Sequence, residues 1–519
     1  MAKKVTLDAM IQREDFALSD ENFELELIRD LQISNLAPGS HILKMLRKPD
    51  FQRETNQWTP EQLVTFIASF LDNEVIPSII LWKSPSYIFV IDGGHRLSAL
   101  RAWMEDDYGD RAISTDFYKG EISDEQKATA KRVRQLVEQR VGRYTTLAGL
   151  VGSKDNADTV SVVRAGRLGT RALNLQWVQG SAATAETSFF KINSQGTPLD
   201  DVEELLIRNR RKPIAIGARA ILRAGTGHQY WSAFSEKVRK QIEVTAEELN
   251  VLLFRPEASP PLRTLDVPLG GAVSPVDAHA LLIEYLSIAG SSSSTPDSLE
   301  SQEDDDKGER VVVLLRRARD VTSRITGNGP GSLGLHPAVY FYNERGKYNR
   351  FLFLGLASVF AAAIRNGNSE LFKRFTDARS GIEKFLVDNK NILGLALQNT
   401  SKAQRVPRMQ SLFSLLIQEF YLHRRIPSLN YALSEVGFRG KLLDLGEQVA
   451  GGEFSDDVKS QLFISEALKS ALKCPLCDGY LIPSKSVSFD HKKRKREGGE
   501  GGLSNAQMTH PYCNTGYKS

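Results

Sequence analysis

The sequence predicts an α+β protein with a mixed N-terminal domain, a mostly helical middle and a small metal-supported C-terminal module. Three observations predict this class. Helical and strand-like patterns alternate between residues 59 and 104, helical spacing dominates from residue 336 to about residue 463, and all three cysteines follow residue 473. A chain of 519 residues exceeds the size of one core. We therefore expect domains over residues 1–225, 226–465 and 466–519.

The composition is that of an ordinary soluble protein, with 41% hydrophobic and 25% charged residues. A formal net charge of +4 is too small to indicate a nucleic-acid partner by itself. The N-terminus lacks the apolar core of a secretory signal. The longest apolar run, residues 351–364, is shorter than a membrane span and predicts a buried helix, so no membrane partner is expected. Three cysteines in one short segment indicate a metal site in a cytoplasmic protein.

Residues 59–104 predict helix, strand, strand, turn and helix in that order. The apolar residues of PEQLVTFIASFLDN (60–73) recur at helical spacing, with Thr59 as the N-cap and Pro60 in the first turn. The runs IPSIILW (76–82) and YIFVI (87–91) are β-branched and aromatic, which is typical of buried strands. LSALRAWM (97–104) returns to helical periodicity.

The stretch DGGHR (92–96) joins the second strand to the second helix. Two glycines there allow a sharp turn and a close approach of the backbone to a ligand. The N-terminus of the following helix offers free N–H groups to an anion, and an arginine can fork onto phosphate. From the residues alone, a purely structural turn between strand and helix explains the pattern equally well.

The rest of the N-terminal half and the linker are simpler. Residues 123–144 have a basic helical pattern, and TSFFKINSQGTPLDDVEELLIRNRR (187–211) predicts an extended piece, a turn and a helix. Residues 289–310 are rich in serine and then in acidic residues, with too few apolar residues to form a core. We expect a disordered loop over about 289–309.

Five pieces of sequence resemble one known family in their order. They are FQR (51–53), Trp58, IPSIIL (76–81), IDGGHRLSAL (91–100) and FFKINSQGTPLDDVEEL (189–205). Together they resemble the ParB/sulfiredoxin-like family, and in particular the GmrSD-type and Ssp-type restriction proteins of bacterial anti-phage defence. The resemblance implies a nucleotide-binding sensor domain over residues 1–225. It leaves the choice among GTP, ATP and CTP open.

The resemblance also implies which residues face the nucleotide. They are Asp92, Gly93, His95 and Arg96, with Gln52, Arg53 and Asn193 as a second group. The commoner DGQQR of this branch is replaced here, because Gly94 and His95 stand where it has two glutamines. Hydrolysis of the nucleotide, as distinct from its binding, is therefore open. Sulfiredoxin-like redox chemistry is excluded, because it needs a cysteine and none precedes Cys474.

The C-terminal segment carries two knuckles of metal ligands. They are Cys474-x-x-Cys477 and His510-x-x-Cys513. Three thiolates and one imidazole suit a closed, tetrahedral structural zinc. The alternative is that His510 is a surface or catalytic histidine and that no metal binds.

Between and beside the knuckles lie Asp490, His491, Asn505 and Asn514. This spacing resembles the HNH, or ββα-metal, nuclease family. The expected strand before Asp490 should direct both Asp490 and His491 into one cleft. Phosphodiester cleavage needs a base near neutral pH, a role suited to histidine, and a hard cation such as Mg²⁺, which prefers oxygen ligands. We therefore expect His491 as the general base and Asp490 and Asn514 as ligands of Mg²⁺ or another divalent cation.

By the same resemblance, Asn505 fixes the loop that carries His491. The basic run HKKRKR (491–496) should track a nucleic-acid backbone.

The leading hypothesis is a nucleotide-regulated HNH endonuclease that cuts DNA in modification-dependent restriction of phages. Two alternatives remain open: a ParB-like nucleotide-dependent DNA-binding protein with a non-catalytic zinc module, and an RNA-cleaving nuclease of a toxin type. The DNA mark, the nucleotide and the formation of a homo-oligomer are not fixed by the sequence.

Overall fold

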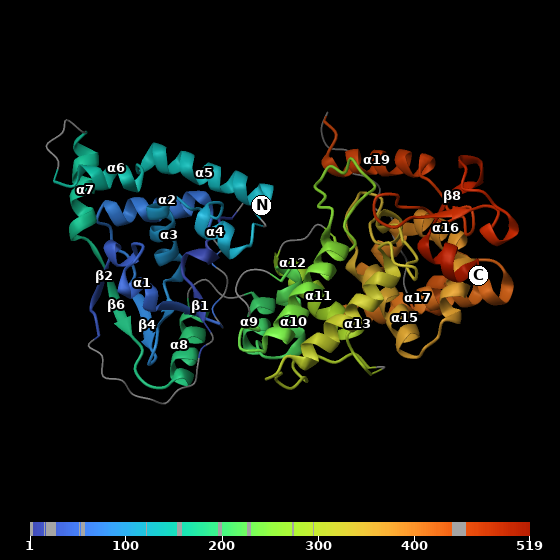
Figure 1. Cartoon of the computed structure of the whole chain (residues 1–519), viewed down its shortest axis with the longest axis horizontal. Coiled ribbons are helices and arrows are strands. Elements are labelled where there is room, and N and C mark those ends of the chain that lie inside the picture. Colours follow the sequence, from blue (N-terminus) through green and yellow to red (C-terminus); the bar gives the residue numbers. More distant parts are fainter. Residues whose placement is uncertain are drawn as a thin grey trace. The chain divides into compact units, whose positions relative to one another are not determined.

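The computed structural model describes residues 4–518 apart from 15, 17–26, 51, 53, 54, 56, 57, 121, 153–157, 196–199, 226–229, 272–274, 294 and 439–452. The chain forms two compact units (Figure 1). The first is Met1–Arg210 with Thr226–Tyr230, and the second is Arg211–Gly225 with Trp231–Ser519. The predicted α+β class is confirmed. The predicted boundary at residue 225 differs, because helix α10 (Pro213–Leu222) packs against helices of the second unit.

A mixed sheet of six strands forms the centre of the first unit, in the order β1-β3-β5-β4-β6-β2. The strands are β1 (Arg13–Glu14), β2 (Asp30–Gln32), β3 (Leu46–Pro49), β4 (Ile79–Lys83), β5 (Ile88–Asp92) and β6 (Ala172–Trp177). β5 runs parallel to β3 and antiparallel to β4, with Trp82 opposite Phe89. The two strands predicted at 76–82 and 87–91 are therefore the neighbouring strands β4 and β5.

Helices cover both faces of this sheet, as Figure 1 shows. Leu81 and Val90 pack with helices α2 and α3 on one face, whereas Trp82 and Phe89 pack with α8 on the other. The alternation follows from the pleat, which directs successive side chains to opposite faces. The helices are α1 (His41–Met45), α2 (Pro60–Leu71), α3 (Gly94–Glu105), α4 (Ala112–Phe117), α5 (Asp124–Arg140), α6 (Tyr144–Leu150), α7 (Thr159–Thr170), α8 (Ala182–Gln195) and α9 (Asp201–Arg208).

The predicted N-cap of α2 is present. Thr59 Oγ1 accepts a hydrogen bond from the Gln62 N–H at 3.2 Å, and Gln62 Oε1 accepts one from the Thr59 N–H at 2.9 Å. This reciprocal pair is a capping box, which satisfies two N–H groups that the helix itself leaves unpaired. Local sequence therefore determines where α2 begins.

The extended piece predicted at the start of 187–211 is wrong, because these residues belong to helix α8. Ala182, Ala185 and Phe189 are buried together against Trp82 and Phe89 of the sheet. Their spacing of three and four residues matches one face of a helix. The aromatic and β-branched run favours a strand locally, and packing on the sheet overrides that preference.

The second unit is dominated by helices. They are α10, α11 (Glu236–Phe254), α12 (Pro275–Ala289), α13 (Glu309–Ile325), α14 (Pro337–Tyr340), α15 (Arg350–Arg365), α16 (Glu370–Gln398), α17 (Lys402–His423), α18 (Leu429–Glu435) and α19 (Asp456–Ser470). The apolar run at 351–364 forms α15, which is buried over most of its length. Within the described part of the chain, no helix is both long and apolar enough to cross a membrane.

The serine-rich and acidic segment before α13 forms no helix or strand in its described residues, but it packs onto the unit. Leu299 and Asp305 are buried, at 4% and 6% exposed. The Asp305 carboxylate accepts hydrogen bonds from the N–H groups of Gly308 and Val311 at 2.9 Å and so caps α13. The composition predicted disorder, whereas one leucine and one capping aspartate anchor the segment.

The C-terminal residues do not form a compact unit of their own. Strands β7 (Ser488–His491) and β8 (Ala506–Thr509) pair antiparallel, and short helical turns follow at η3 (Lys495–Glu497), η4 (Leu503–Asn505) and η5 (Cys513–Tyr517). These elements belong to the second unit, whose helix α16 contacts η5. The predicted boundary at residue 466 therefore falls inside one compact unit.

His336, a buried histidine beside Tyr480 of the C-terminal segment, should make the fold less stable in acid. His336 is 3% exposed, and its burial, aided by Lys390 and Arg379, lowers its pKa from 6.5 to about 3. Below about pH 6.5 the unfolded chain takes a proton that the folded chain refuses, so stability falls as the pH falls toward the folded pKa. By pH 5 this one group costs about 2 kcal/mol of unfolding free energy.

The corresponding measurement is chemical unfolding at pH 7 and pH 5 of the unaltered chain and of His336→Gln. The difference between the two pH values should be about 2 kcal/mol smaller in the variant, because the titrating group is gone. Protonation of the Cys₃His residues affects the unaltered protein and the variant equally, so it cancels in this comparison. Equal differences would show that His336 does not titrate as described.

Candidate functional site

The turn after β5 has the geometry of an anion site. Gly93 has a φ of +96°, and a Cβ placed on it would collide with Ile79, so glycine is required there. Helix α3 begins at once, at Gly94. The first N–H groups of a helix have no partner within it and carry the positive end of its dipole.

Arg96 braces this turn from within the protein. Its Nη2 atom pairs with Asp92 Oδ2, and its Nη1 atom donates to the carbonyl oxygens of Pro77 and Ser78. The guanidinium therefore binds the carboxylate at the end of β5 and two carbonyl oxygens of the loop before β4. Arg96 is expected to bind a phosphate group through both terminal nitrogens. In this conformation the same nitrogens instead bind the residues around the turn.

A cavity of about 150 Å³ lies at the turn. It is lined by Gln52, Thr55, Trp58, Ile91, Asp92, Gly93, Gly94, His95, Arg96 and Phe189. Gln52 is 8% exposed, and its Oε1 atom is buried without a hydrogen-bond partner among the described residues. A Cβ on Gly94 would lie 3.1 Å from that atom. A buried amide oxygen without a partner is costly unless a ligand or water satisfies it.

The other members of the predicted nucleotide set are placed only in part. The His95 ring lies 5.6 Å from the Trp58 ring, measured between centroids. Asn193 lies in α8, whose side chains are not described at that end, and Arg53 lies outside the described residues. The structure therefore gathers Gln52, Asp92, Gly93, His95 and Arg96 around one cavity.

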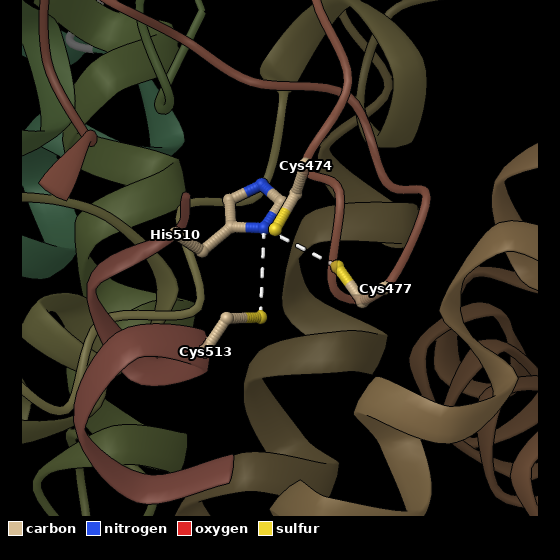
Figure 2. Close-up of side chains that lie close together, drawn as sticks. All are labelled: Cys474, Cys477, His510 and Cys513. Atoms are coloured by element: carbon tan, nitrogen blue, oxygen red, sulfur yellow. Dashed lines mark hydrogen bonds between the residues drawn. The ribbon is translucent and has the colours of Figure 1, made fainter. Parts of the chain in front are cut away.

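The four predicted zinc ligands meet at one point (Figure 2). One candidate ligand atom from each of Cys474, Cys477, His510 and Cys513 lies within 4.8 Å of the others. His510 Nδ1 lies 3.4 Å from Cys477 Sγ and 3.8 Å from Cys513 Sγ. The opposite ring atom, Nε2, lies 2.9 Å from the carbonyl oxygen of Tyr480. Since Nε2 can reach that oxygen only as a donor, Nδ1 is left as the ligand atom, the arrangement that metal-binding histidines favour.

The protonation of this cluster suits a divalent cation. Hydrogen bonds from Cys477 and Cys513 lower the pKa of Cys474, and the reciprocal bonds raise the pKa of the Cys477 thiol to about 11 and that of Cys513 further. Burial lowers the pKa of His510, so its imidazole is neutral at physiological pH. Three thiols this close cannot all ionise alone, and a bound cation displaces their protons. The donor set fits tetrahedral zinc.

Asp490 and Asn514 lie on one face of the β7–β8 ribbon. Asn514 Nδ2 donates to Ser488 Oγ at 2.8 Å, and Ser488 and Asp490 share a face because they are two residues apart in a strand. Asp490 Oδ2 accepts from Gln507 Nε2 at 2.9 Å and from Lys518 Nζ at 2.7 Å. Burial acts to raise the pKa of Asp490, but these two bonds outweigh it and hold the pKa below its ordinary value.

His491 is the last residue of the same strand as Asp490, and strand alternation directs its side chain to the other face of the ribbon. A cleft shared by Asp490 and His491 stays a prediction. The ring is half-buried and makes no hydrogen bond within the described part of the chain. Asn505 holds the loop that follows, since its Oδ1 accepts from the Lys493 N–H at 2.7 Å and its Nδ2 donates to Glu500 at 2.7 Å.

Residues 33–211 match the family model described as GmrSD restriction endonuclease, N-terminal domain. The first unit is a GmrSD-type domain. No curated protein and no solved structure matches the chain significantly. The GmrSD match ends at residue 211, next to the boundary between the two compact units, and includes the whole DGGHR turn.

Several residues at these sites escaped prediction. In the GmrSD-type domain, Thr55 and Phe189 line the cavity although neither is a typical nucleotide ligand. At the C-terminus, Gln507 holds the Asp490 carboxylate and had no sequence signal. Lys518, which ends the HNH-like pattern after Asn514, binds the same carboxylate, a contact that the pattern did not specify.

Proposed function

We propose that this protein is a nucleotide-regulated restriction endonuclease whose C-terminal HNH module cuts DNA in anti-phage defence. The GmrSD-type domain supports the restriction role. The observation that carries the nuclease assignment is the placement of Asp490 and Asn514 on one face of a strand whose next residue is His491, beside a Cys₃His cluster. In this proposal the cluster holds a structural zinc and sets the geometry of a separate catalytic site.

The end of β7 carries the residue types that an in-line displacement at phosphorus needs. His491 takes a proton from water as the water oxygen bonds to phosphorus and the phosphorus–oxygen bond on the far side breaks. Asp490 and the Asn514 amide oxygen would hold a divalent cation such as Mg²⁺, which would supply stabilisation of negative charge at the phosphate. Lys518 keeps Asp490 ionised and donates to the His491 carbonyl at 2.6 Å, which fixes the end of the strand.

The basic run after His491 supplies affinity for a polyanion. Lys493, Lys495 and Arg496 are exposed, whereas Arg494 is tied to the Lys518 carbonyl. Exposed lysines and arginines beside the base bind backbone phosphates without reading sequence. Binding should therefore weaken steeply as salt rises.

The GmrSD-type domain is proposed as a ParB/sulfiredoxin-like nucleotide sensor. A cavity of about 150 Å³ is smaller than the roughly 300–1,000 Å³ of ordinary small-molecule sites. It can take a phosphate group against the N–H groups of α3, while the rest of a nucleotide lies outside. The Gln52 amide oxygen, which has no hydrogen-bond partner among the described residues, would be satisfied by a polar ligand in this cavity.

The experiment that tests the proposal incubates the purified protein with Mg²⁺, each nucleoside triphosphate in turn, and phage DNAs with different base or backbone modifications. Cleavage of one DNA that responds to one nucleotide is the expected result. Binding of every DNA without cleavage would favour the nucleotide-dependent DNA-binding alternative. Degradation of RNA in place of DNA would favour the toxin-type nuclease.

Gly94→Val tests the sensor directly. The added side chain would press on Gln52 and fill the cavity, so nucleotide affinity should fall at least tenfold, or about 1.4 kcal/mol. Isothermal titration calorimetry with each triphosphate measures this. The matched control is Gly166→Val in α7, where a Cβ meets nothing within 4 Å, and its affinity should be unchanged. Equal affinities in the two variants would remove the cavity from the proposal.

A further inference from the structure

Helix α16 carries a fully buried ion pair beside the Cys₃His cluster. Arg379 Nε lies 2.7 Å from Glu383 Oε1, and the two side chains are 0% and 2% exposed. They are four residues apart on one helix, so they face the same direction. Burying two charges is expensive unless each finds further hydrogen bonds.

The further bonds of this pair go to the backbone around the metal knuckle. Arg379 donates to the carbonyl oxygens of Leu333, Gly334 and Tyr480, with Gly334 at 2.9 Å and Tyr480 at 3.4 Å. Glu383 Oε2 accepts from the Tyr480 N–H at 2.8 Å. Both polar groups of the Tyr480 peptide backbone are therefore held by one helix.

Tyr480 connects this pair to a metal ligand. Its carbonyl oxygen also accepts from His510 Nε2, the bond that leaves Nδ1 facing the sulfurs. The backbone of the knuckle also lies close to Arg379, because a Cβ placed on Gly479 would collide with the Arg379 guanidinium. A shift of Arg379 would thus move the backbone that orients His510.

Charge favours the same arrangement. A zinc ion with three thiolates and a neutral imidazole has a net charge of −1, by the formal charges of its parts. The buried guanidinium of Arg379 is a cation without access to water, next to that cluster. An anionic metal centre in a low-dielectric interior is stabilised by a fixed cation at close range.

The same helix also holds the closing turn of the module. Asp377 Oδ1 accepts from Tyr517 Oη at 2.6 Å, and Tyr517 adjoins Lys518 in the turn that carries Asn514. Helix α16 therefore contacts both the metal knuckle and the closing turn.

We propose that Arg379 and Glu383 are positioning residues of the zinc centre. Both hold the Tyr480 backbone that orients His510, and the Arg379 guanidinium offsets the negative charge of the thiolates. The inference rests on the zinc of the proposed function and does not depend on DNA cleavage. It assigns part of the metal site to a helix that begins more than a hundred residues before the first cysteine, at Glu370.

Glu383→Gln in the full chain tests this proposal. The change removes the carboxylate that fixes Arg379 and accepts from the Tyr480 N–H, so the hold on the Tyr480 backbone weakens. Loss of an outer partner of a metal ligand lowers metal affinity about 10- to 100-fold, so zinc should pass to a colorimetric chelator about 10- to 100-fold faster. The absorption spectrum of the Co²⁺-substituted protein should shift, because it reports the thiolate geometry. The matched control is Glu370→Gln, which breaks an exposed pair with Arg374 on the same helix.

Glu370→Gln should release zinc within twofold of the unaltered rate and keep its cobalt spectrum. If Glu383→Gln does not fold, Gly479→Ala tests the proposal in its place. Its methyl group displaces Arg379 without removing a charge, so zinc release should be at least about tenfold faster. A folded Glu383→Gln or Gly479→Ala protein with the release rate and cobalt spectrum of the control would overturn the proposal. Since these readouts need no DNA, a failure here leaves the nuclease proposal standing, and the converse also holds.

Discussion

His491→Ala should lower the rate of DNA cleavage about 10²- to 10⁴-fold, the range ascribed to a positioned general base. DNA affinity should stay within about twofold, because the exposed cations that contact phosphate follow His491 and remain intact. The His491 ring makes no hydrogen bond among the described residues, so its loss should disturb the fold little. Single-turnover cleavage and equilibrium binding of one labelled duplex measure the two quantities.

The control for this change is His423→Ala, which removes an exposed histidine near the end of α17. Its cleavage rate should equal that of the unaltered protein. Full cleavage by His491→Ala would rule out a catalytic role for this residue. A parallel loss of binding and cleavage would instead make His491 a phosphate contact.

Cys513→Ala should remove zinc and cleavage together. Cys513 is 1% exposed, and its neighbour Asn514 is a proposed ligand of the catalytic metal, so loss of the thiolate releases both. Structural zinc binding contributes on the order of 10 kcal/mol to the fold it supports. Zinc content by mass spectrometry should fall from one ion per chain to none, and the thermal midpoint of the second unit should drop.

Chelation of zinc from the unaltered protein should reproduce this loss of cleavage, and added Zn²⁺ should restore it. The same addition should fail to rescue Cys513→Ala, because one ligand is missing. Full zinc content and full cleavage in the variant would show that the Cys₃His cluster is not the zinc site.

Local signals predicted some parts of the fold and the grouping of the four candidate metal ligands. The cap at Thr59, the paired strands β4 and β5 and the buried helix at 351–364 follow from hydrogen-bonding side chains and apolar spacing within a few residues. The four metal ligands were recognisable because knuckle spacing is set by the metal itself.

The remaining parts depend on contacts that no local pattern records. Helix α8 forms because the sheet offers a face for Phe189, and Asp305 orders an acidic loop by capping a helix. The pair Arg379 and Glu383 looks like any i, i+4 ion pair of an exposed helix, and only its burial against Tyr480 distinguishes it. The opposite facing of Asp490 and His491 follows from strand alternation, which outweighs their adjacency in sequence.

The attachment of the β7–β8 ribbon to the helices limits how this chain could have been assembled by gene fusion. Ser486 Oγ donates to the Gly327 carbonyl at 2.6 Å, the Val487 N–H to Asn328 at 3.1 Å, and the Tyr512 N–H to the Ser332 carbonyl at 2.9 Å. A segment transplanted from residue 466 onward would leave these groups, and those of Tyr480, without partners. A segment that keeps these hydrogen bonds must therefore begin at Gly327 or earlier. Recombination between the helices of the second unit and the last fifty residues would remove them.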